Sequence, residues 1–410
     1  MTSSDSQTQK IREIPSGATE ADPSVGVYVH IPFCERVCPY CDFAVVAARQ
    51  IDPGVEARYV DALLRELETR RHAFAGRQLA TVYFGGGTPS LLRPDSLGRI
   101  VAAARAAFAS EAEPGEVTLE MNPSTTERAR LAAFRSVGIN RLSMGIQSFD
   151  DTTLKKLGRA HKAQESHAMI EAARSAGFEN LSLDLILACP GQTFASFERD
   201  LDAALAHSPE HLSVYELTIE SGTPFALANE RGQLDRPDED LASEMLEHTV
   251  RSGAAAGVER YEVSNFAKPG YESVHNRRYW ERSPVLGLGM GAWSAEVRGG
   301  DMPYGGRLMN PRDLLSYLAA IEEEESDFRV IDCLNEEQAR GEAMFLGLRT
   351  RKGLNARAFE TEFGSPPRSF YAEQIERLMA QGLMTETNDG GLCLTDRGVL
   401  LSDTVFTDFV

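Results

Sequence analysis

Short apolar runs and longer amphipathic segments alternate along the chain from Val25 to about Glu262. Several apolar runs are almost continuous in Val, Ile, Leu and Tyr, which is typical of parallel strands covered on both faces. We predict strands at residues 25–31, 80–84, 117–121, 141–146, 181–187, 211–217 and 258–263. The segments between them predict helices at residues 55–74, 97–108, 127–137, 164–176, 194–207 and 238–255. This alternation predicts an incomplete parallel (β/α) barrel of six or seven units, which is an α/β fold.

The rest of the chain has a different pattern. Residues 264–310 are rich in Gly and aromatic residues and show little periodicity, and residues 311–325 look helical and end in an acidic run that we interpret as a solvated face. Helical patterns at 335–348, 355–363 and 367–381 precede a hairpin signal around Asn388 to Gly391, which resembles a winged helix. The predicted domains are therefore a disordered polar tail (1–24), the barrel core (25–263), a Gly/aromatic segment with a linking helix (264–330) and a small C-terminal winged-helix-like domain (331–410).

Composition limits the partners and the compartment. The chain has 410 residues, of which 42 are Lys or Arg and 61 are Asp or Glu, so its formal net charge is −19. Such a charge argues against binding to nucleic acid, because phosphate affinity requires a basic face. No apolar stretch approaches the roughly 20 residues that span a bilayer, and the polar N-terminus lacks the apolar core of a signal peptide. We therefore expect a cytoplasmic protein whose thiols stay reduced.

Three cysteines lie within eight residues, directly after the first predicted strand: Cys34, Cys38 and Cys41. Pro32 and Pro39 oppose regular structure there, so we expect a loop on which the three sulfurs converge. Thiolates are soft ligands that suit zinc or an iron–sulfur cluster. Structural zinc usually takes four ligands, and three sulfurs instead suit a [4Fe–4S] cluster with one open iron. Two alternatives stay open, zinc with His30 as a fourth ligand and no metal at all.

Polar residues follow the ends of the other predicted strands, where the active face of a parallel barrel lies. Gly85, Gly86 and Gly87 precede Thr88 and would let the backbone approach a ligand and present N–H donors, although a tight turn would explain them too. Further candidates are Glu120, Gln147, Arg159 and Asp184. Singly, Gln147 could be a strand-end hydrogen bonder, Arg159 a surface ion pair and Asp184 a partner of a neighbouring loop. Together they suit a ligand that carries an amine, a carboxylate and a ribose.

The Cys34-x₃-Cys38-x₂-Cys41 spacing followed by Gly85-Gly86-Gly87-Thr88-Pro89 resembles the radical S-adenosylmethionine (SAM) superfamily. The resemblance implies a [4Fe–4S] cluster whose open iron chelates SAM and can cleave it to a 5′-deoxyadenosyl radical. It also implies the following SAM contacts: Tyr40 to adenine, Gly86, Gly87 and Thr88 to the amino acid part, Glu120, Gln147 and Arg159 to polar groups, Asp184 to the ribose, and Tyr28 facing the open site from the first strand.

A closer resemblance, over about residues 25 to 405, is to oxygen-independent coproporphyrinogen III oxidases and the related HemW-type heme chaperones. It rests on residues 28–34, 140–149, 157–161, 184–186, 347–349 and 394–398. The oxidases resemble a C-x₃-C-x₂-C-x-C pattern with a longer N-terminal segment. Here Phe43 stands at the fourth cysteine position and only a short polar tail precedes the motif. Both departures favour the chaperones.

The segment His275-Asn276-Arg277-Arg278-Tyr279-Trp280 is similar to the H-N-x-x-Y-W signature that HemW-type proteins associate with heme. An imidazole can ligate heme iron, and Tyr279 and Trp280 offer flat apolar surface. Asn276 belongs to the same motif, and the two arginines could meet the propionates. The alternative is that His275 and Trp280 pin this irregular segment onto the barrel.

The resemblance implies a heme chaperone that binds a cluster, SAM and heme, and delivers heme from donor proteins to acceptors, with respiratory hemoproteins as the expected acceptors. Any membrane association would then be peripheral or through a partner. Two other functions stay open, a coproporphyrinogen III oxidase that decarboxylates propionates and a zinc protein without redox chemistry. Whether the chain is an enzyme, whether it cleaves SAM, and its oligomeric state do not follow from the sequence.

Overall fold

Six parallel strands form the centre of the molecule. The computed structural model describes residues 23–108, 115–323 and 329–410, so the predicted tail lies almost entirely outside the described residues. The strands follow one another in chain order across the sheet. They are β1 (Ser24–Ile31), β4 (Gln78–Gly86), β5 (Glu116–Met121), β6 (Arg141–Gln147), β7 (Leu181–Leu187) and β8 (His211–Glu216). This arrangement confirms the predicted incomplete parallel barrel.

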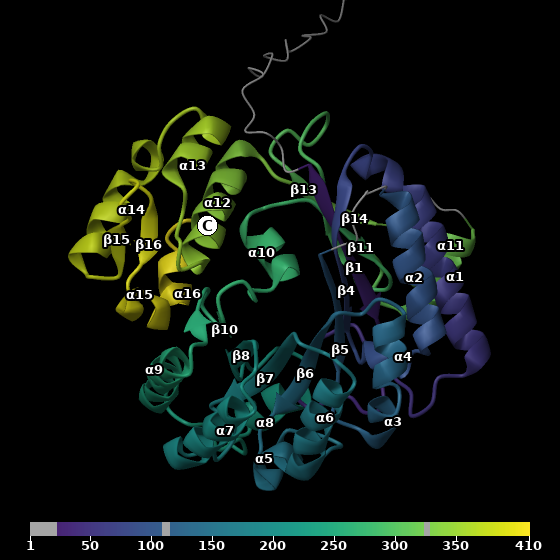
Figure 1. Cartoon of the computed structure of the whole chain (residues 1–410). Helices are drawn as coiled ribbons and strands as arrows, with labels where there is room; N and C mark the ends of the chain where they lie inside the picture. The colour runs from purple at the N-terminus through teal and green to yellow at the C-terminus, as the bar shows by residue number, and fades with distance from the viewer. Residues whose placement is uncertain (1–22, 109–114, 324–328) are drawn as a thin grey trace, which may run out of the picture.

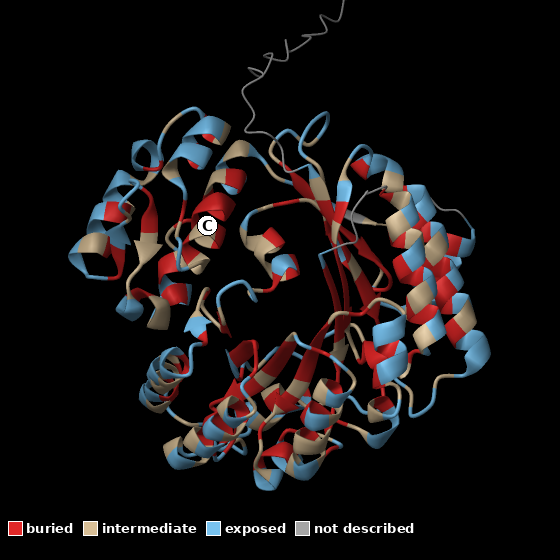
Figure 2. Ribbon diagram, in the orientation of Figure 1, coloured by how far each residue is buried: buried red, intermediate tan, exposed pale blue. Residues whose placement is uncertain are grey.

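Helices cover the convex side of this curved sheet (Figure 1). They are α1 (Pro53–Arg70), α2 (Pro94–Ala107), α3 (Thr125–Arg128), α4 (Leu131–Ser136), α5 (Asp151–Lys156), α6 (Ala163–Ser175), α7 (Phe194–Ala206) and α9 (Glu239–Ala255). Three further short helices are η1 (Arg71–Phe74), η2 (Pro89–Leu91) and α8 (Pro224–Glu230). Asp52 begins α1 by accepting the N–H groups of Gly54 and Val55, as an N-cap carboxylate does. Figure 2 shows buried residues along the strands and on the sheet-facing sides of the helices, where the main core lies.

The helix predicted at residues 127–137 is two helices, α3 and α4. Ser124 caps α3 by accepting the N–H of Glu127, and α4 begins only at Leu131. The break places the Glu127 carboxylate in the interior, where it accepts hydrogen bonds from Ser90 and from the Asn122 backbone. The apolar spacing of this segment alone predicts one helix. The side-chain hydrogen bonds of Ser124 and Glu127 accompany the break into two.

The sheet continues beyond the barrel at both edges. The seventh parallel strand is β11 (Val285–Leu288), which pairs with β1 and not with β8. The predicted strand at 258–263 is reduced to β9 (Glu259–Arg260), which pairs antiparallel with β10 (Asn265–Ala267). Beside β11 follow the antiparallel β12 (Trp293–Ala295), β13 (Gly306–Met309) and β14 (Val330–Cys333).

The sequence pattern did not predict β11, because this short strand contains a glycine. A Cβ on Gly287 would lie 2.1 Å from the carbonyl oxygen of Trp293, so close packing against β12 requires glycine there. Gly289 has φ +97°, and a Cβ there would lie 2.6 Å from the carbonyl oxygen of His30. The glycines at positions 287 and 289 therefore permit close chain packing.

Residues after β14 form a second, smaller body at the open side of the barrel (Figure 1). It contains α12 (Glu336–Arg349), α13 (Ala356–Phe363), α14 (Arg368–Ala380), the hairpin β15 (Met384–Glu386) and β16 (Leu392–Leu394), and two helices that were not predicted, α15 (Asp396–Leu400) and α16 (Ser402–Phe406). It has its own hydrophobic core within residues 339–409. The predicted domain boundaries remain predictions.

Several ion pairs connect this C-terminal body to the rest of the chain. Arg349 on α12 donates to Glu262 at 3.0 Å, and Arg282 donates to Glu342 at 3.0 Å. Between the two bodies lies α10 (Val274–Trp280), inside the arc of the sheet (Figure 1). The C-terminal body therefore closes the side that an incomplete barrel leaves open.

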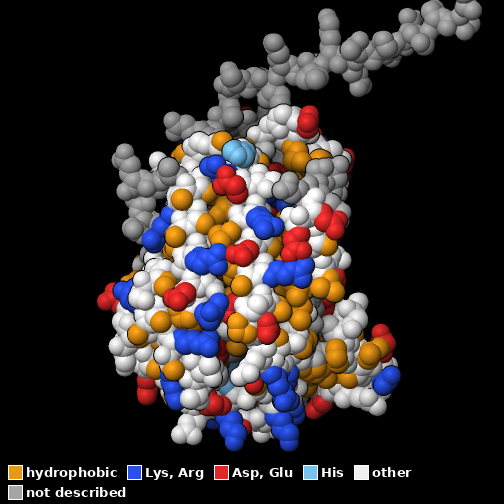
Figure 3. Space-filling view, turned by 90° about the vertical axis from the view of Figure 1, so that its right-hand side faces the viewer, with side chains coloured by type: hydrophobic (Ala, Val, Ile, Leu, Met, Phe, Trp, Pro, Cys, Tyr) orange, Lys and Arg blue, Asp and Glu red, His pale blue; other side chains and the backbone are white. Residues whose placement is uncertain are grey.

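The face formed by α1, α2 and α11 (Leu314–Glu322) carries charges of both signs among apolar side chains (Figure 3). Arg58 pairs with Glu322 at 2.6 Å, and Arg99 pairs with Asp61 at 2.8 Å. In the part of the chain that the structure describes, no helix has both the length and the apolar character that crossing a membrane requires.

Candidate functional site

A cavity of about 1070 Å³ opens at the carboxyl ends of the barrel strands and reaches the C-terminal body. The side chains of Cys34, Cys38 and Cys41 line it together with residues from β4 to β8 and from α16. Drug-sized ligand sites occupy about 300–1,000 Å³. The cavity therefore has room for more than one small ligand.

The cysteine segment is held by a short pair of strands. Cys34 lies in β2 (Phe33–Cys34), which pairs with β3 (Val46–Ala47), so the prediction that all three cysteines lie on a loop is wrong for Cys34. Cys38 and Cys41 follow in a turn closed by the Cys41 N–H, which donates to the Cys38 carbonyl at 3.1 Å. The three sulfurs thus face one cavity from a fixed backbone.

This geometry disfavours the zinc alternative. Among the residues of 23–108, 115–323 and 329–410, no three His, Cys, Asp or Glu side chains are placed to hold a single metal ion. His30, the suggested fourth ligand, uses Nε2 on the Ala44 carbonyl at 2.7 Å and Nδ1 on the Tyr28 hydroxyl at 3.2 Å. A cluster spreads its thiolates over three irons and does not need them to meet at one point. The donor set therefore fits a cluster better than it fits zinc.

Two cysteine sulfurs accept hydrogen bonds from cavity residues. Thr88 Oγ1 lies 3.8 Å from Cys34 Sγ, and Arg159 Nη1 lies 3.6 Å from Cys38 Sγ. Burial raises the pKa of Cys34 to about 11 and also raises the pKa of Cys41. Buried thiolates without a cation are unfavourable, so bound iron would supply the charge that stabilises them.

The N–H groups of the glycine turn (Gly86 to Thr88) donate to groups of the protein itself. The Gly86 N–H donates to Glu120 at 3.2 Å, and the N–H groups of Gly87 and Thr88 donate to the carbonyls of Ile31 and Phe33, both at 2.8 Å. A Cβ on Gly87 would lie 2.7 Å from the Phe33 oxygen. The interpretation of this turn as a set of free N–H donors is therefore wrong: the turn holds β1 and the cysteine segment, and Gly86, Gly87 and Thr88 all line the cavity.

Glu120 lies deep in the cavity wall on β5. Its carboxylate accepts from the Tyr83 hydroxyl at 2.8 Å. Burial raises the pKa of Glu120 to about 7, although these hydrogen bonds act the other way. Glu120 can therefore exist with or without its proton near neutral pH, and it would bind either a hydroxyl or an ammonium group.

Asp184 on β7 faces the same cavity, and serines surround it. Its carboxylate accepts from Ser143 at 3.0 Å and from Ser182 at 3.1 Å, and a further hydrogen bond comes from Ser213. Burial raises the pKa of Asp184 despite these donors. The local-partner interpretation and the ribose interpretation are both compatible with this arrangement, because a carboxylate accepts about four hydrogen bonds.

Three further candidates line the cavity: Gln147, Tyr40 and Arg159. Gln147 ends β6 with φ +66°, a left-handed conformation that turns the chain after the strand. Arg159 is not a surface residue: it donates to the Gly145 carbonyl at 2.9 Å and to Asn122 Oδ1, and its Nε has no partner among the described residues. A hydrogen bond also joins Tyr40 to Arg159, and burial raises the pKa of Tyr40.

Most of the predicted heme motif does not reach the cavity. Asn276 lines it, whereas His275, Tyr279 and Trp280 do not. His275 accepts or donates at Thr81 Oγ1 (2.7 Å) and at the Tyr279 hydroxyl (3.1 Å), so neither ring nitrogen is free to ligate iron in this conformation. Tyr28 also lies outside the lining residues and packs against Tyr83.

The two arginines of this motif are also engaged. Arg277 pairs with Glu281 at 2.7 Å on the helix surface. Arg278 is buried and donates to the backbone carbonyls of Ser24 and Pro284 at 3.0 Å. Arg349 lies over the Trp280 ring at 4.4 Å. These contacts favour the interpretation that α10 is pinned between the barrel and the C-terminal body.

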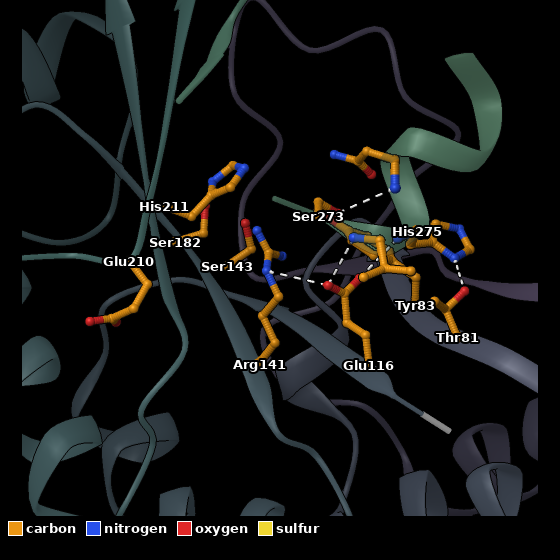
Figure 4. Close-up of polar contacts among 12 residues, drawn as sticks. Thr81, Tyr83, Glu116, Arg141, Ser143, Ser182, Glu210, His211, Ser273 and His275 are labelled. Carbon is orange, nitrogen blue, oxygen red and sulfur yellow. Dashed lines mark hydrogen bonds and ion pairs between the residues drawn. The ribbon is translucent and has the colours of Figure 1, made fainter. Parts of the chain in front are cut away.

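A buried ion pair that the sequence did not predict lies where α10 meets the barrel (Figure 4). Glu116 accepts the N–H groups of Val274 and His275, both at 3.0 Å. Arg141, which is also fully buried, lies 3.9 Å from Glu116, and its Nε has no hydrogen-bond partner among the described residues. A charged residue at the start of an apolar strand was the available signal.

Comparisons with known proteins identify two matching family models. The radical SAM superfamily model matches residues 28–204, and the HemN C-terminal domain model matches residues 334–401. The chain is 34% identical to the heme chaperone HemW of Bacillus subtilis, over 93% of this chain and 98% of that protein. The chain belongs to the HemW family of radical SAM proteins. A mitochondrial radical SAM domain-containing protein 1 from mouse is 33% identical, over 96% and 89% of the two chains.

Among solved structures, this radical SAM chain is similar to the coproporphyrinogen III oxidase HemN of Escherichia coli. The TM-score is 0.78 at 25% identity, and the match covers 94% of this chain and 90% of that one. The barrel with its C-terminal domain is therefore common to chaperones and an oxidase, and the fold alone does not separate the two functions.

Proposed function

We propose that the chain is a cytoplasmic heme chaperone that binds a [4Fe–4S] cluster, SAM and heme, and passes heme to acceptor proteins. The observation that carries this proposal is the cavity of about 1070 Å³, which joins the three cysteines to the C-terminal body. The names of the relatives support it, since several that match most of this chain are heme chaperones HemW.

In this proposal Cys34, Cys38 and Cys41 hold the cluster. The cluster supplies an open iron for the amino and carboxylate groups of SAM and a store of one electron. The hydrogen bonds from Thr88 and Arg159 would then be charge-assisted, because they would end on thiolates and not on thiols.

SAM would lie along the strand ends beside the cluster. The guanidinium of the half-buried Arg159, whose Nε is buried and has no hydrogen-bond partner among the described residues, suits a carboxylate. Gly86 and Gly87 would offer carbonyl oxygens to the ammonium group, because their N–H groups are engaged. Thr88, Gln147 and Glu120 would bind other polar groups, Asp184 the ribose and Tyr40 the adenine ring, and Tyr28 would support this wall from behind.

Heme would occupy the part of the cavity next to the C-terminal body. Tyr215 at the end of β8 and Leu401 before α16 both line the cavity, and they are 41% and 42% exposed. Large apolar side chains left uncovered inside a cavity suit a flat apolar ligand. Asn276 belongs to the same wall. His275, Tyr279 and Trp280 would hold α10 in place, and His275 would ligate iron only after losing one of its hydrogen bonds.

Heme donors and acceptors, with respiratory hemoproteins proposed as acceptors, would meet the chain at the cavity mouth. No membrane segment of the chain itself enters this proposal, so acceptors in a membrane would be reached peripherally or through a partner.

The test is heme binding by anaerobically reconstituted protein, followed by absorbance titration. We expect one heme per chain and weaker binding by Tyr215→Ala and Leu401→Ala. Leu227→Ala is the matched control, because Leu227 is 49% exposed but lies outside the cavity lining. Equal affinities for the four proteins would refute the heme position.

A parallel assay separates the chaperone from the oxidase. Parent protein with SAM, a reductant and coproporphyrinogen III is incubated without oxygen, and the products are measured. We expect no protoporphyrinogen above background. Sustained formation of protoporphyrinogen would refute the chaperone proposal and establish the oxidase.

A further inference from the structure

Two of the cysteine sulfurs receive their hydrogen bonds from segments that are far apart in the chain. Thr88, after β4, donates to Cys34 Sγ at 3.8 Å, and Arg159, after α5, donates to Cys38 Sγ at 3.6 Å. These distances fit hydrogen bonds to sulfur, which are longer than those to oxygen. Nothing in the sequence spacing links the two donors.

Asn122, which follows β5, connects them. Its Nδ2 donates to Thr88 Oγ1 at 2.9 Å, and its Oδ1 accepts from Arg159 Nη2. Thr88 Oγ1 therefore accepts from Asn122, and its own hydrogen stays available for Cys34 Sγ. The direction of every hydrogen bond from the guanidinium to the Cys34 sulfur is fixed.

The surroundings hold Asn122 in this orientation. Its backbone N–H lies 3.4 Å from Glu127 Oε1. Arg159 Nη2 also donates to the Gly145 carbonyl at 2.9 Å. A Cβ on Gly145 would lie 3.0 Å from Asn122 Oδ1 and 3.2 Å from Arg159 Nη2, so the absence of a side chain there leaves room for the contact.

We infer that Asn122 is a positioning residue for the iron–sulfur cluster, which joins the donors to Cys34 and Cys38 into one relay from Arg159. The relay directs positive charge toward two of the three cluster thiolates. Hydrogen bonds to ligating sulfurs raise the reduction potential of a cluster, because they stabilise the more negative reduced state. This inference rests on the cluster of the proposed function and is independent of heme.

The test is a redox titration of the anaerobically reconstituted cluster, followed by electron paramagnetic resonance. We expect Asn122→Ala and Thr88→Val each to lower the midpoint potential relative to the parent. The double variant should shift by less than the sum of the two, because both substitutions break the same relay. Thr88→Ser keeps the hydroxyl and should restore the parent potential.

Thr404→Val is the control, since Thr404 on α16 lines the same cavity, whereas the hydrogen bonds to Cys34 Sγ and Cys38 Sγ in the described part of the chain come from Thr88 and Arg159. Its potential should equal that of the parent. A parent-like potential for Asn122→Ala, or additive shifts in the double variant, would overturn the inference. If Asn122→Ala fails to assemble a cluster, Thr88→Val decides: a lowered potential supports the relay and an unchanged one refutes it.

The two proposals fail in different ways. A parent protein that assembles no cluster would refute the proposed function. A parent with a cluster and variants with unchanged potentials would refute the relay alone.

Discussion

Two roles of His275 lead to different predictions for its substitution. One is ligation of heme iron, and the other is packing of α10 through hydrogen bonds. Its ring donates or accepts at Thr81, whose side chain is fully buried, and at the hydroxyl of the half-buried Tyr279. His275→Ala removes both hydrogen bonds, and the buried Thr81 hydroxyl and the half-buried Tyr279 hydroxyl each lose this partner. Net losses of about 1 kcal/mol per hydrogen bond, plus the cost of a buried unsatisfied group, give a destabilisation of about 3 kcal/mol at pH 7.

The destabilisation should depend on pH. Burial, with help from Arg278 and Arg141, lowers the pKa of His275 to about 3 from the ordinary value of 6.5. Below pH 6.5 the unfolded chain binds a proton at this residue and the folded chain does not, so acid favours unfolding by about 1.4 kcal/mol per pH unit. At pH 5 the parent has lost about 2 kcal/mol through this residue, and the alanine variant has not. The difference between the two proteins should therefore shrink to about 1 kcal/mol.

The assay is urea unfolding of parent and variant at pH 7 and pH 5, reported by tryptophan fluorescence, since Trp280 lies on the same helix. His72→Ala is the matched control, because His72 is exposed and its substitution should change neither value. Heme titration of the same variant should give an affinity close to that of the parent. Unchanged stability together with lost heme affinity would refute this reasoning and make His275 an iron ligand.

Three further predictions concern the cluster and the attachment of α10. Cys38→Ala should lose most of the bound iron measured after anaerobic purification, whereas Cys189→Ala should keep it, because Cys189 is buried outside the cavity; equal iron contents would contradict the ligand assignment. Glu116→Gln should lower the free energy of unfolding by about 3 kcal/mol, because buried Arg141 loses its ion-pair partner. A change below about 0.5 kcal/mol in urea unfolding would exclude a stabilising role for this ion pair. Gly87→Ala should reduce labile sulfide while circular dichroism stays like that of the parent, because a Cβ would displace the cysteine segment; full sulfide content would show that the turn tolerates it.

The sequence predicted the regularly alternating strands and helices of the barrel. Six buried strands with helices between them have strong periodicity, and their order in the sheet follows their order in the chain. The predicted heme motif shows the limit, because the sequence left two roles open for His275 and only the contacts with Thr81 and Tyr279 favour one of them.

The sequence could not predict pairings between distant segments. β11 contains only four residues, one of them glycine, and it pairs with β1 across more than 200 residues of chain. The relay through Asn122 joins ends of different strands, and a single asparagine before a proline gives no sign of its partners. The direction in which the glycine turn donates its N–H groups likewise depends on where Ile31 and Phe33 lie.

Three cysteines should bind three irons of a cubane and leave the fourth iron without a protein ligand. Mössbauer spectra of ⁵⁷Fe-labelled protein, recorded without oxygen before and after adding SAM, test it directly. We predict a [4Fe–4S] spectrum in which one iron site changes when SAM is added and the other three do not. A spectrum without a cubane, or one in which SAM alters no iron site, would contradict this coordination of the cluster.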